Sequence, residues 1–136
     1  MTQFSMYGAV PLDTIKRAML GLKADGRLDR LKMLDLTNCT FDGHMYNVRR
    51  VIEECLAIKP DLIFLWYEAW SGFAHFSPFM RPRTAMGAAG DLEAWLREPS
   101  SFAAYEEQRE LGESPSDDKL LHARLIPDPR RVRPRV

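Results

Sequence analysis

Two polar segments follow apolar runs of the sequence, and their side chains are of types that could contact a ligand. In "TNCTFDG", residues 37–43, Asn38, Thr40 and Asp42 supply an amide, a hydroxyl and a carboxylate. In "YEAW", residues 67–70, a phenol and a carboxylate close the run "LIFLW". Polar groups of this kind also form turns and cap helices without any ligand. Which interpretation applies depends on the elements that position them.

The elements between these segments predict a strand, a helix and a second strand. "LKMLDLT" (31–37) is a short apolar run that reads as a buried strand, and "DLIFLWYEAW" (61–70) contains another. Residues 48–58 have helical spacing, with Asn47 as the expected N-cap and Pro60 as the expected stop. A βαβ unit implies parallel strands, and ligands of such sheets bind beyond the carboxyl ends of the strands. Both polar segments lie at such ends.

The helix predicted over residues 48–58 has two distinct faces. Its polar face is formed by Arg49, Arg50, Glu53 and Glu54. Its apolar face is formed by Val48, Val51, Ile52, Cys55 and Leu56. The helix is therefore expected to cover one side of the sheet.

The rest of the sequence is expected to pack around this unit. Residues 11–25 predict a helix, and the aromatic-rich residues 71–86 predict a packed loop interrupted by prolines. A short helix containing Leu92 is expected to end at Pro99, and residues 100–111 predict another helix. "LLHARLIP" could begin a strand, while "GESPSDDK" and the arginine-rich end, residues 113–136, predict a surface connection and tail.

Composition narrows the possible functions. The chain has 136 residues, 46% of them hydrophobic and 28% charged, with a formal net charge of zero. These values fit one soluble domain and give no electrostatic reason to expect nucleic acid as a partner. No apolar run is long enough to span a bilayer, and the N-terminal residues do not resemble a signal peptide, so a cytoplasmic location is expected.

The cysteines and histidines do not have the spacing of a metal site. Cys39 and Cys55 form no CxxC pair and are expected to be free thiols. His44, His75 and His122 are far apart in sequence. We therefore expect no metal.

Taken together, "TNCTFDGHMYN" and "LIFLWYEAWSGFAHFSPF" resemble the bacterial ornithine/lysine/arginine decarboxylases, which use pyridoxal phosphate (PLP). The resemblance extends from "YGAVPLDTIKRAML" to "DDKLLHARLIPDP". It implies a mostly parallel α/β sheet of the aspartate-aminotransferase type, which agrees with the βαβ prediction. It also implies a basic amino acid as substrate, and dimers or larger assemblies with active sites at subunit interfaces.

The resemblance places four residues near the cofactor. Tyr67 occupies the position beside the ring nitrogen, and Ala69 the position that packs on the ring face. Trp70 would lie close to the cofactor and Asn38 on the facing loop. For Ala69 and Trp70, packing in the core is the alternative.

One departure from the family concerns the lysine that holds PLP as an aldimine. The family carries this lysine in a Ser-x-His-Lys segment, which does not occur among these 136 residues. Neither does the upstream segment that binds the cofactor phosphate. We therefore expect no catalytic residue in this chain, and we interpret residues 1–136 as a single partial domain, a middle fragment of the large domain. The lysines of the sequence are Lys16, Lys23, Lys32, Lys59 and Lys119.

A second departure concerns the ring nitrogen, where the family has an aspartate and this sequence has Tyr67. A carboxylate keeps the pyridine nitrogen protonated by its charge, whereas a phenol, with a reference pKa of about 10, is neutral at pH 7. Glu68 is not an obvious substitute, since neighbouring residues of a strand face opposite sides.

These departures predict that the chain alone does not decarboxylate ornithine, lysine or arginine. Two alternatives remain open at this point. The chain could be a non-catalytic partner of a related decarboxylase, because an incomplete sheet with exposed edges favours association. It could also be the product of a decayed gene.

Overall fold

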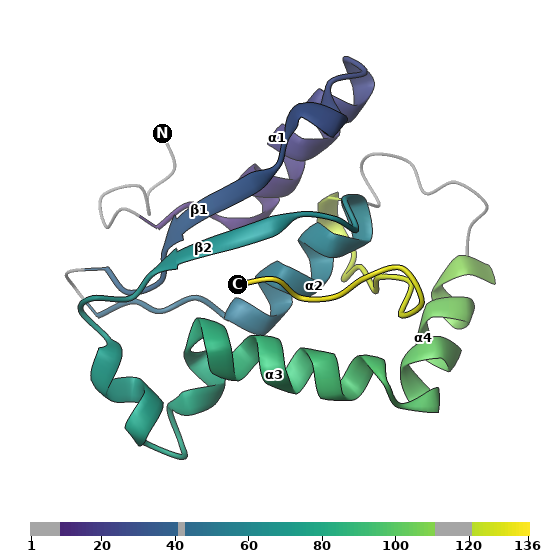
Figure 1. Ribbon diagram of the computed structural model, residues 1–136. Helices are drawn as coiled ribbons and strands as arrows, with labels where there is room; N and C mark the ends of the chain where they lie inside the picture. The colour runs from purple at the N-terminus through teal and green to yellow at the C-terminus, as the bar shows by residue number, and fades with distance from the viewer. Residues whose placement is uncertain (1–8, 41–42, 111–120) are drawn as a thin grey trace.

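The computed structural model describes residues 9–40, 43–110 and 121–136, and it contains the predicted βαβ unit (Figure 1). Strand β1 (Met33–Thr37) leads through helix α2 (Val48–Ile58) to strand β2 (Ile63–Tyr67). The two strands are parallel, with Thr37 opposite Tyr67. The expected α/β class is confirmed.

Local sequence signals fix the bounds of α2. The side-chain oxygen of Asn47 accepts a hydrogen bond of 3.2 Å from the backbone N–H of Arg50, which caps the first turn. The helix ends before Lys59, whose backbone is extended, as expected for a residue that precedes proline. Gly43, on the loop between β1 and α2, has a φ of 81°, a conformation that favours glycine.

Further helical elements lie outside the βαβ unit. Helix α1 (Leu12–Ala24) confirms the helix predicted over residues 11–25. Residues 71–86 contain two short 3₁₀ helices, η3 (Gly72–Phe76) and η4 (Arg81–Arg83). The remaining elements are the 3₁₀ helix η2 (Leu28–Arg30) and the helices α3 (Ala85–Leu96) and α4 (Pro99–Glu110).

The two predicted helices in this region are present, and their bounds differ from the expected ones by a few residues. Helix α3 begins earlier than Leu92 suggested, because Thr84 caps it by accepting a hydrogen bond of 3.2 Å from the backbone N–H of Gly87. Pro99 starts α4 as well as following α3, since proline fits the first turn of a helix, where no intrahelical donor is needed. The described part of "LLHARLIP" contains no strand.

The hydrophobic core lies between one face of the sheet and the helices. Leu36 and Phe64 extend from the strands into this core. The helices and the C-terminal segment contribute the other fully buried members, among them Met19, Ile52, Leu56, Leu92 and Val132. Figure 1 shows α3 running below α2, on the side away from the strands.

The other face of the sheet is open in the described part of the molecule. Met33, Ile63 and Leu65 are between 41% and 50% exposed. The expectation of two fully buried strands was therefore wrong, because the described helices cover one face only. Alternation along each strand is retained, with Leu36 and Phe64 on the covered face.

The polar face predicted for α2 is not open to solvent throughout, since Glu53 and Glu54 are fully buried. Lys16 of α1 forms an ion pair of 2.6 Å with Glu54. Arg124, from the C-terminal segment, donates to both carboxylate oxygens of Glu53 at 3.0 and 3.2 Å. The two carboxylates are buried because distant basic side chains reach them.

The C-terminal segment, residues 121–136, crosses in front of α2 in Figure 1. Val132 lies in the core, and the carbonyl oxygen of Arg135 accepts a hydrogen bond of 2.9 Å from the backbone N–H of Phe64. Residues 113–120, part of the predicted surface connection, lie outside the described residues. Among the described helices, none has the length and apolar character needed to cross a bilayer.

Candidate functional site

The candidate site is the edge of the sheet where β1 and β2 end together. The backbone N–H of Asn38 donates to the carbonyl oxygen of Tyr67 at 3.0 Å, which extends the parallel ladder one residue beyond β1. The predicted site segments, residues 37–43 and 67–70, therefore begin side by side, as the βαβ prediction required.

Asn38 is fully buried at this edge, and the structure uses both ends of its amide. Its nitrogen donates to Oε1 of Glu68 at 2.7 Å and to the carbonyl oxygen of Arg83 at 2.9 Å. Its oxygen accepts a hydrogen bond of 3.2 Å from the backbone N–H of Tyr46. Asn38 thus joins the end of β1 to three other segments.

The carboxylate of Glu68 occupies the same corner. Its Oε1 also accepts a hydrogen bond of 2.8 Å from the backbone N–H of Ala85, the first residue of α3. A carboxylate is stabilised at a helix N-terminus, where backbone N–H groups lack intrahelical acceptors. Glu68 therefore has a structural role, and it lies on the face of β2 opposite to that of Tyr67, as the alternation predicted.

Tyr67, Ala69 and Trp70 lie on the accessible side of this edge. Tyr67 is 53% exposed and Trp70 is 63% exposed. Ala69 is exposed as well. Core packing, the alternative considered for Ala69 and Trp70, does not describe them in this structure.

The four residues that the resemblance placed near the cofactor are thus divided between two sides. Asn38 points to the covered face with Glu68, whereas Tyr67 belongs to the open face. Asp35 and Thr37 are exposed and lie opposite Leu65 and Tyr67 in the register. Thr37 belongs to the segment 37–43 that the sequence singled out, whereas Asp35 was not considered as a site residue. The alternation of β1 alone would have placed both on the face of Tyr67.

The described residues do not by themselves fit PLP. The carboxylate at this edge, Glu68, is engaged by Asn38 and Ala85, and Tyr67 offers a phenol where a pyridinium needs a negative charge. Lys32 and Lys59 flank the opposite ends of the strands, before β1 and before β2. Lys16 is buried in its ion pair, and Lys119 lies outside the described residues.

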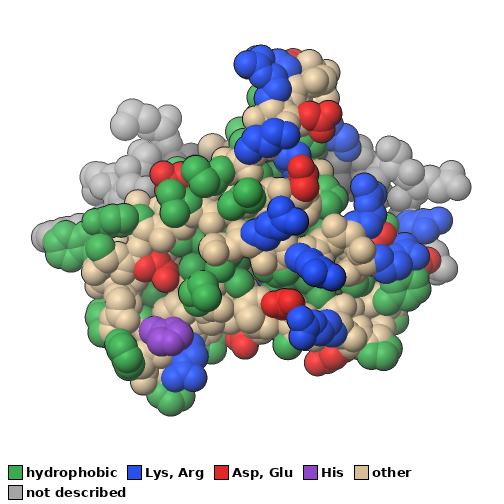
Figure 2. Space-filling model, in the orientation of Figure 1, with side chains coloured by type: hydrophobic (Ala, Val, Ile, Leu, Met, Phe, Trp, Pro, Cys, Tyr) green, Lys and Arg blue, Asp and Glu red, His purple; other side chains and the backbone are tan. Residues whose placement is uncertain are grey.

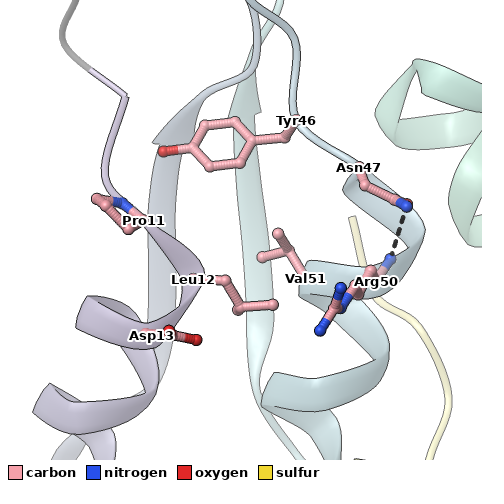
Figure 3. A pocket seen from close by; sticks show the side chains of 7 residues that line it. All are labelled: Pro11, Leu12, Asp13, Tyr46, Asn47, Arg50 and Val51. Atoms are coloured by element: carbon pink, nitrogen blue, oxygen red, sulfur yellow. Dashed lines mark hydrogen bonds between the residues drawn. The ribbon is translucent and has the colours of Figure 1, made fainter. Parts of the chain in front are cut away.

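A pocket of about 410 Å³ opens near this edge, between the N-termini of α1 and α2 (Figure 3). The hydroxyl of Tyr46 donates to the carbonyl oxygen of Val10 at 2.8 Å and accepts from its backbone N–H at 2.6 Å. Burial raises the pKa of this phenol, while its contact with the Val10 backbone lowers it by less. None of the four predicted site residues lines the pocket, whose walls are Pro11, Leu12, Asp13, Tyr46, Asn47, Arg50 and Val51.

The part of the chain that the structure describes contains no cluster of three or more His, Cys, Asp or Glu side chains placed to hold a metal ion.

Comparison with known proteins identifies the family. The sequence model of the Orn/Lys/Arg decarboxylase major domain matches residues 2–98. Lysine decarboxylase LdcA of Pseudomonas aeruginosa is 27% identical over 115 residues, which cover 80% of this chain and 14% of that protein. No solved structure matched. The chain spans a small part of this relative's length, and by its match to the major domain it belongs to the Orn/Lys/Arg decarboxylase family.

Proposed function

We propose that this chain is part of the major domain of a PLP-dependent decarboxylase of ornithine, lysine or arginine, and that these 136 residues alone are inactive. The family match and the similarity to a lysine decarboxylase support the parent activity. One observation supports the proposed inactivity of the chain. The carboxylate at the cofactor edge, Glu68, is held on the covered face by Asn38 and Ala85, while Tyr67 stands at the ring-nitrogen position.

In this proposal the accessible side of the edge receives the cofactor. Tyr67 would lie beside the ring nitrogen and Ala69 would pack on the ring face. Trp70 would lie close to the cofactor. Asn38 would act through Glu68, because its amide is fully engaged by protein groups. The lysine and the phosphate-binding groups would come from other residues of a decarboxylase. A cytoplasmic location and a basic amino acid substrate belong to the same proposal.

A direct experiment is to incubate the purified chain with PLP and each of the three amino acids and to measure released carbon dioxide. We expect no release above that of free PLP, because the Ser-x-His-Lys segment that carries the cofactor lysine does not occur in this sequence and Tyr67 stands at the ring-nitrogen position. Release above the PLP blank with any one amino acid would contradict the proposed inactivity.

A second experiment tests the position of Tyr67. Tyr67→Asp is expected to tighten binding of PLP, measured by titration of cofactor fluorescence, because a carboxylate can pair with the ring nitrogen. Leu65→Asp is the matched control, since Leu65 lies on the same open face two residues earlier and is 49% exposed. Equal effects of the two substitutions would argue against a ring-nitrogen site at Tyr67.

The alternative function is non-catalytic association with a related decarboxylase chain or with a second copy. It is favoured by the open sheet face and by three aromatic side chains around η3. Phe73, Phe76 and Phe79 are 64%, 83% and 92% exposed. Figure 2 shows hydrophobic side chains at the end of the molecule where η3 and η4 lie.

Analytical ultracentrifugation of the chain, alone and with a lysine decarboxylase, tests this alternative. Association is expected to weaken in Leu65→Lys, which places a charge in the open face. A stable monomer that does not bind the decarboxylase would exclude it.

A further inference from the structure

A second hollow, of about 370 Å³, lies along the first turns of α2. None of its walls belongs to the cofactor edge around Tyr67 and Trp70. The lining residues are Asn47, Arg49, Arg50, Glu53 and Arg124, and we call this site the arginine pocket. Arg50 and Asn47 also border the pocket of Figure 3, at the N-terminus of α2.

Positive charge exceeds negative charge in the arginine pocket. Its walls carry three guanidinium groups and one carboxylate, that of Glu53. Both oxygens of Glu53 accept hydrogen bonds from Nη2 of Arg124. Among the described residues, the lining carboxylate of Glu53 is thus hydrogen-bonded to Arg124, and its charge offsets the two further guanidinium groups of Arg49 and Arg50 only in part.

Glu54 neutralises the charge of Arg50 only in part, because Glu54 also pairs with Lys16. Nε of Arg50 donates to Oε1 of Glu54 at 2.7 Å, and the pKa of Arg50 is raised by this contact. The other oxygen of Glu54 already binds Lys16 at 2.6 Å. One carboxylate is thus shared by two cations, and the side chain of Arg50 remains 51% exposed.

Arg49 provides an independent sign of a missing acceptor. Its Nε is buried and has no hydrogen-bond partner in the described part of the molecule. Its guanidinium lies over the ring of Trp95, 5.5 Å from the ring centre, which restricts its orientation. A buried donor without an acceptor is unfavourable, and Arg49 is one of the residues that line the pocket.

The helix adds to the attraction. The first N–H groups of an α-helix lack intrahelical acceptors and create a partial positive charge. In α2, the side chain of Asn47 accepts the N–H of Arg50. A guanidinium group can donate two parallel hydrogen bonds, so arginines beside a helix N-terminus suit an oxyanion with several acceptor oxygens. Phosphate is such an oxyanion.

We propose that the arginine pocket binds a small phosphate-type dianion, such as inorganic phosphate or a phosphate monoester. This inference goes beyond the proposed decarboxylase function, because it involves neither the cofactor edge nor the reaction. Arg49 and Arg50 would supply donors, and Arg124 would remain on Glu53 as part of the wall.

The test is isothermal titration calorimetry of the intact chain with inorganic phosphate, in PLP-free buffer at constant ionic strength. We expect saturable binding to the wild-type chain and affinity lower by about tenfold or more in Arg49→Gln, since one charge-assisted donor is lost. The matched control is Arg97→Gln. Arg97 is 76% exposed on the side of Glu93, outside the pocket, and its loss should leave the affinity unchanged.

Three outcomes would overturn the proposal. These are no saturable heat with the wild-type chain, equal weakening in Arg49→Gln and Arg97→Gln, and binding of malonate as tight as that of phosphate. If Arg49→Gln does not fold, as judged by thermal melting in chloride, Arg50→Gln serves as the second variant and should show the same selective loss. Failure of this test would leave the decarboxylase proposal untouched, because no cofactor or amino acid is used.

Discussion

Nδ2 of Asn38 lies 2.7 Å from Oε1 of Glu68, and this hydrogen bond connects the ends of the two parallel strands. The same oxygen of Glu68 accepts the first N–H of α3 from Ala85. The edge where β1 and β2 end is thus held together by a buried amide and a partly buried carboxylate.

Replacing Asn38 by alanine should destabilise the fold. The substitution removes partners from Glu68, Arg83 and the Tyr46 N–H, and buried polar groups left unpaired cost about 1–3 kcal/mol each. We expect the free energy of unfolding in urea to fall by about 3 kcal/mol. Asn47→Ala, which removes only a helix cap, should cost about 1 kcal/mol. A loss at Asn38 no larger than that at Asn47 would argue against the buried network.

Gly87 should tolerate no side chain, although it lies inside a helix. A Cβ at this position would stand 2.1 Å from the carbonyl oxygen of Arg81, and backbone cannot move aside easily. We expect Gly87→Ala to lower the free energy of unfolding by about 1–3 kcal/mol or more.

The matched control for Gly87 is Gly90→Ala, in the same helix. A Cβ at Gly90 would meet nothing within 4 Å. This substitution should raise stability by up to about 1 kcal/mol, because alanine favours the helix. Chemical denaturation of both variants measures the two changes in the free energy of unfolding. Changes of the same sign would contradict the close approach of the Arg81 carbonyl to Gly87.

The buried ion pair between Lys16 and Glu54 should be costly to break. Both side chains are at most 1% exposed, and Lys16→Met would leave a buried carboxylate with Arg50 as its remaining ion-pair partner. We expect a loss of about 3–5 kcal/mol in unfolding free energy. Arg97→Gln, which breaks the exposed pair with Glu93, should cost at most about 1 kcal/mol. Comparable losses for the two would contradict the burial of Lys16.

Cys55 should be protected from thiol reagents while Cys39 reacts. Burial, and secondarily the charge of Glu54, raises the pKa of the Cys55 thiol to about 12. Cys39 is only partly buried. Titration with a disulfide reagent at pH 8 should therefore count one thiol in the native chain and two in denaturant. Two native thiols of equal rate would contradict this prediction.

The raised pKa of Cys55 also predicts how stability changes with pH. Its folded value lies above the ordinary value of 9.0, so folding favours the protonated thiol. This contribution is complete below about pH 9 and is lost as the pH rises from 9 toward about 12. Cys55→Ala should lack that loss in alkaline unfolding measurements.

The βαβ unit could be predicted because its signals are local. Apolar runs, the Asn47 cap and Pro60 predicted α2 and the two strands, and the alternation of β2 correctly separated Tyr67 from Glu68. The side of the sheet to which Asn38 points could have been predicted in the same way from β1. It was missed because the loop residues were considered without the strand that precedes them.

The burial of Glu53 and Glu54 could not be predicted from the helix alone. Both appear on the polar face of α2, and their partners are Lys16 and Arg124, which are distant in sequence. The prediction of a packed loop over residues 71–86 was wrong for a related reason. Aromatic content suggested packing, yet Phe76 and Phe79 remain exposed because no described element covers η3 and the turn after it.

The contact between Arg124 and Glu53 joins residues 71 positions apart and has a consequence for synthesis of the chain. Translation produces α2 long before Arg124, so the carboxylate of Glu53 must stay in water until the C-terminal segment leaves the ribosome. Contacts between distant positions form slowly, because a long loop has to close first. Docking of residues 121–136 on α2 is therefore expected to follow formation of the βαβ unit, and a nascent chain stopped near residue 98 would still lack the partner of Glu53.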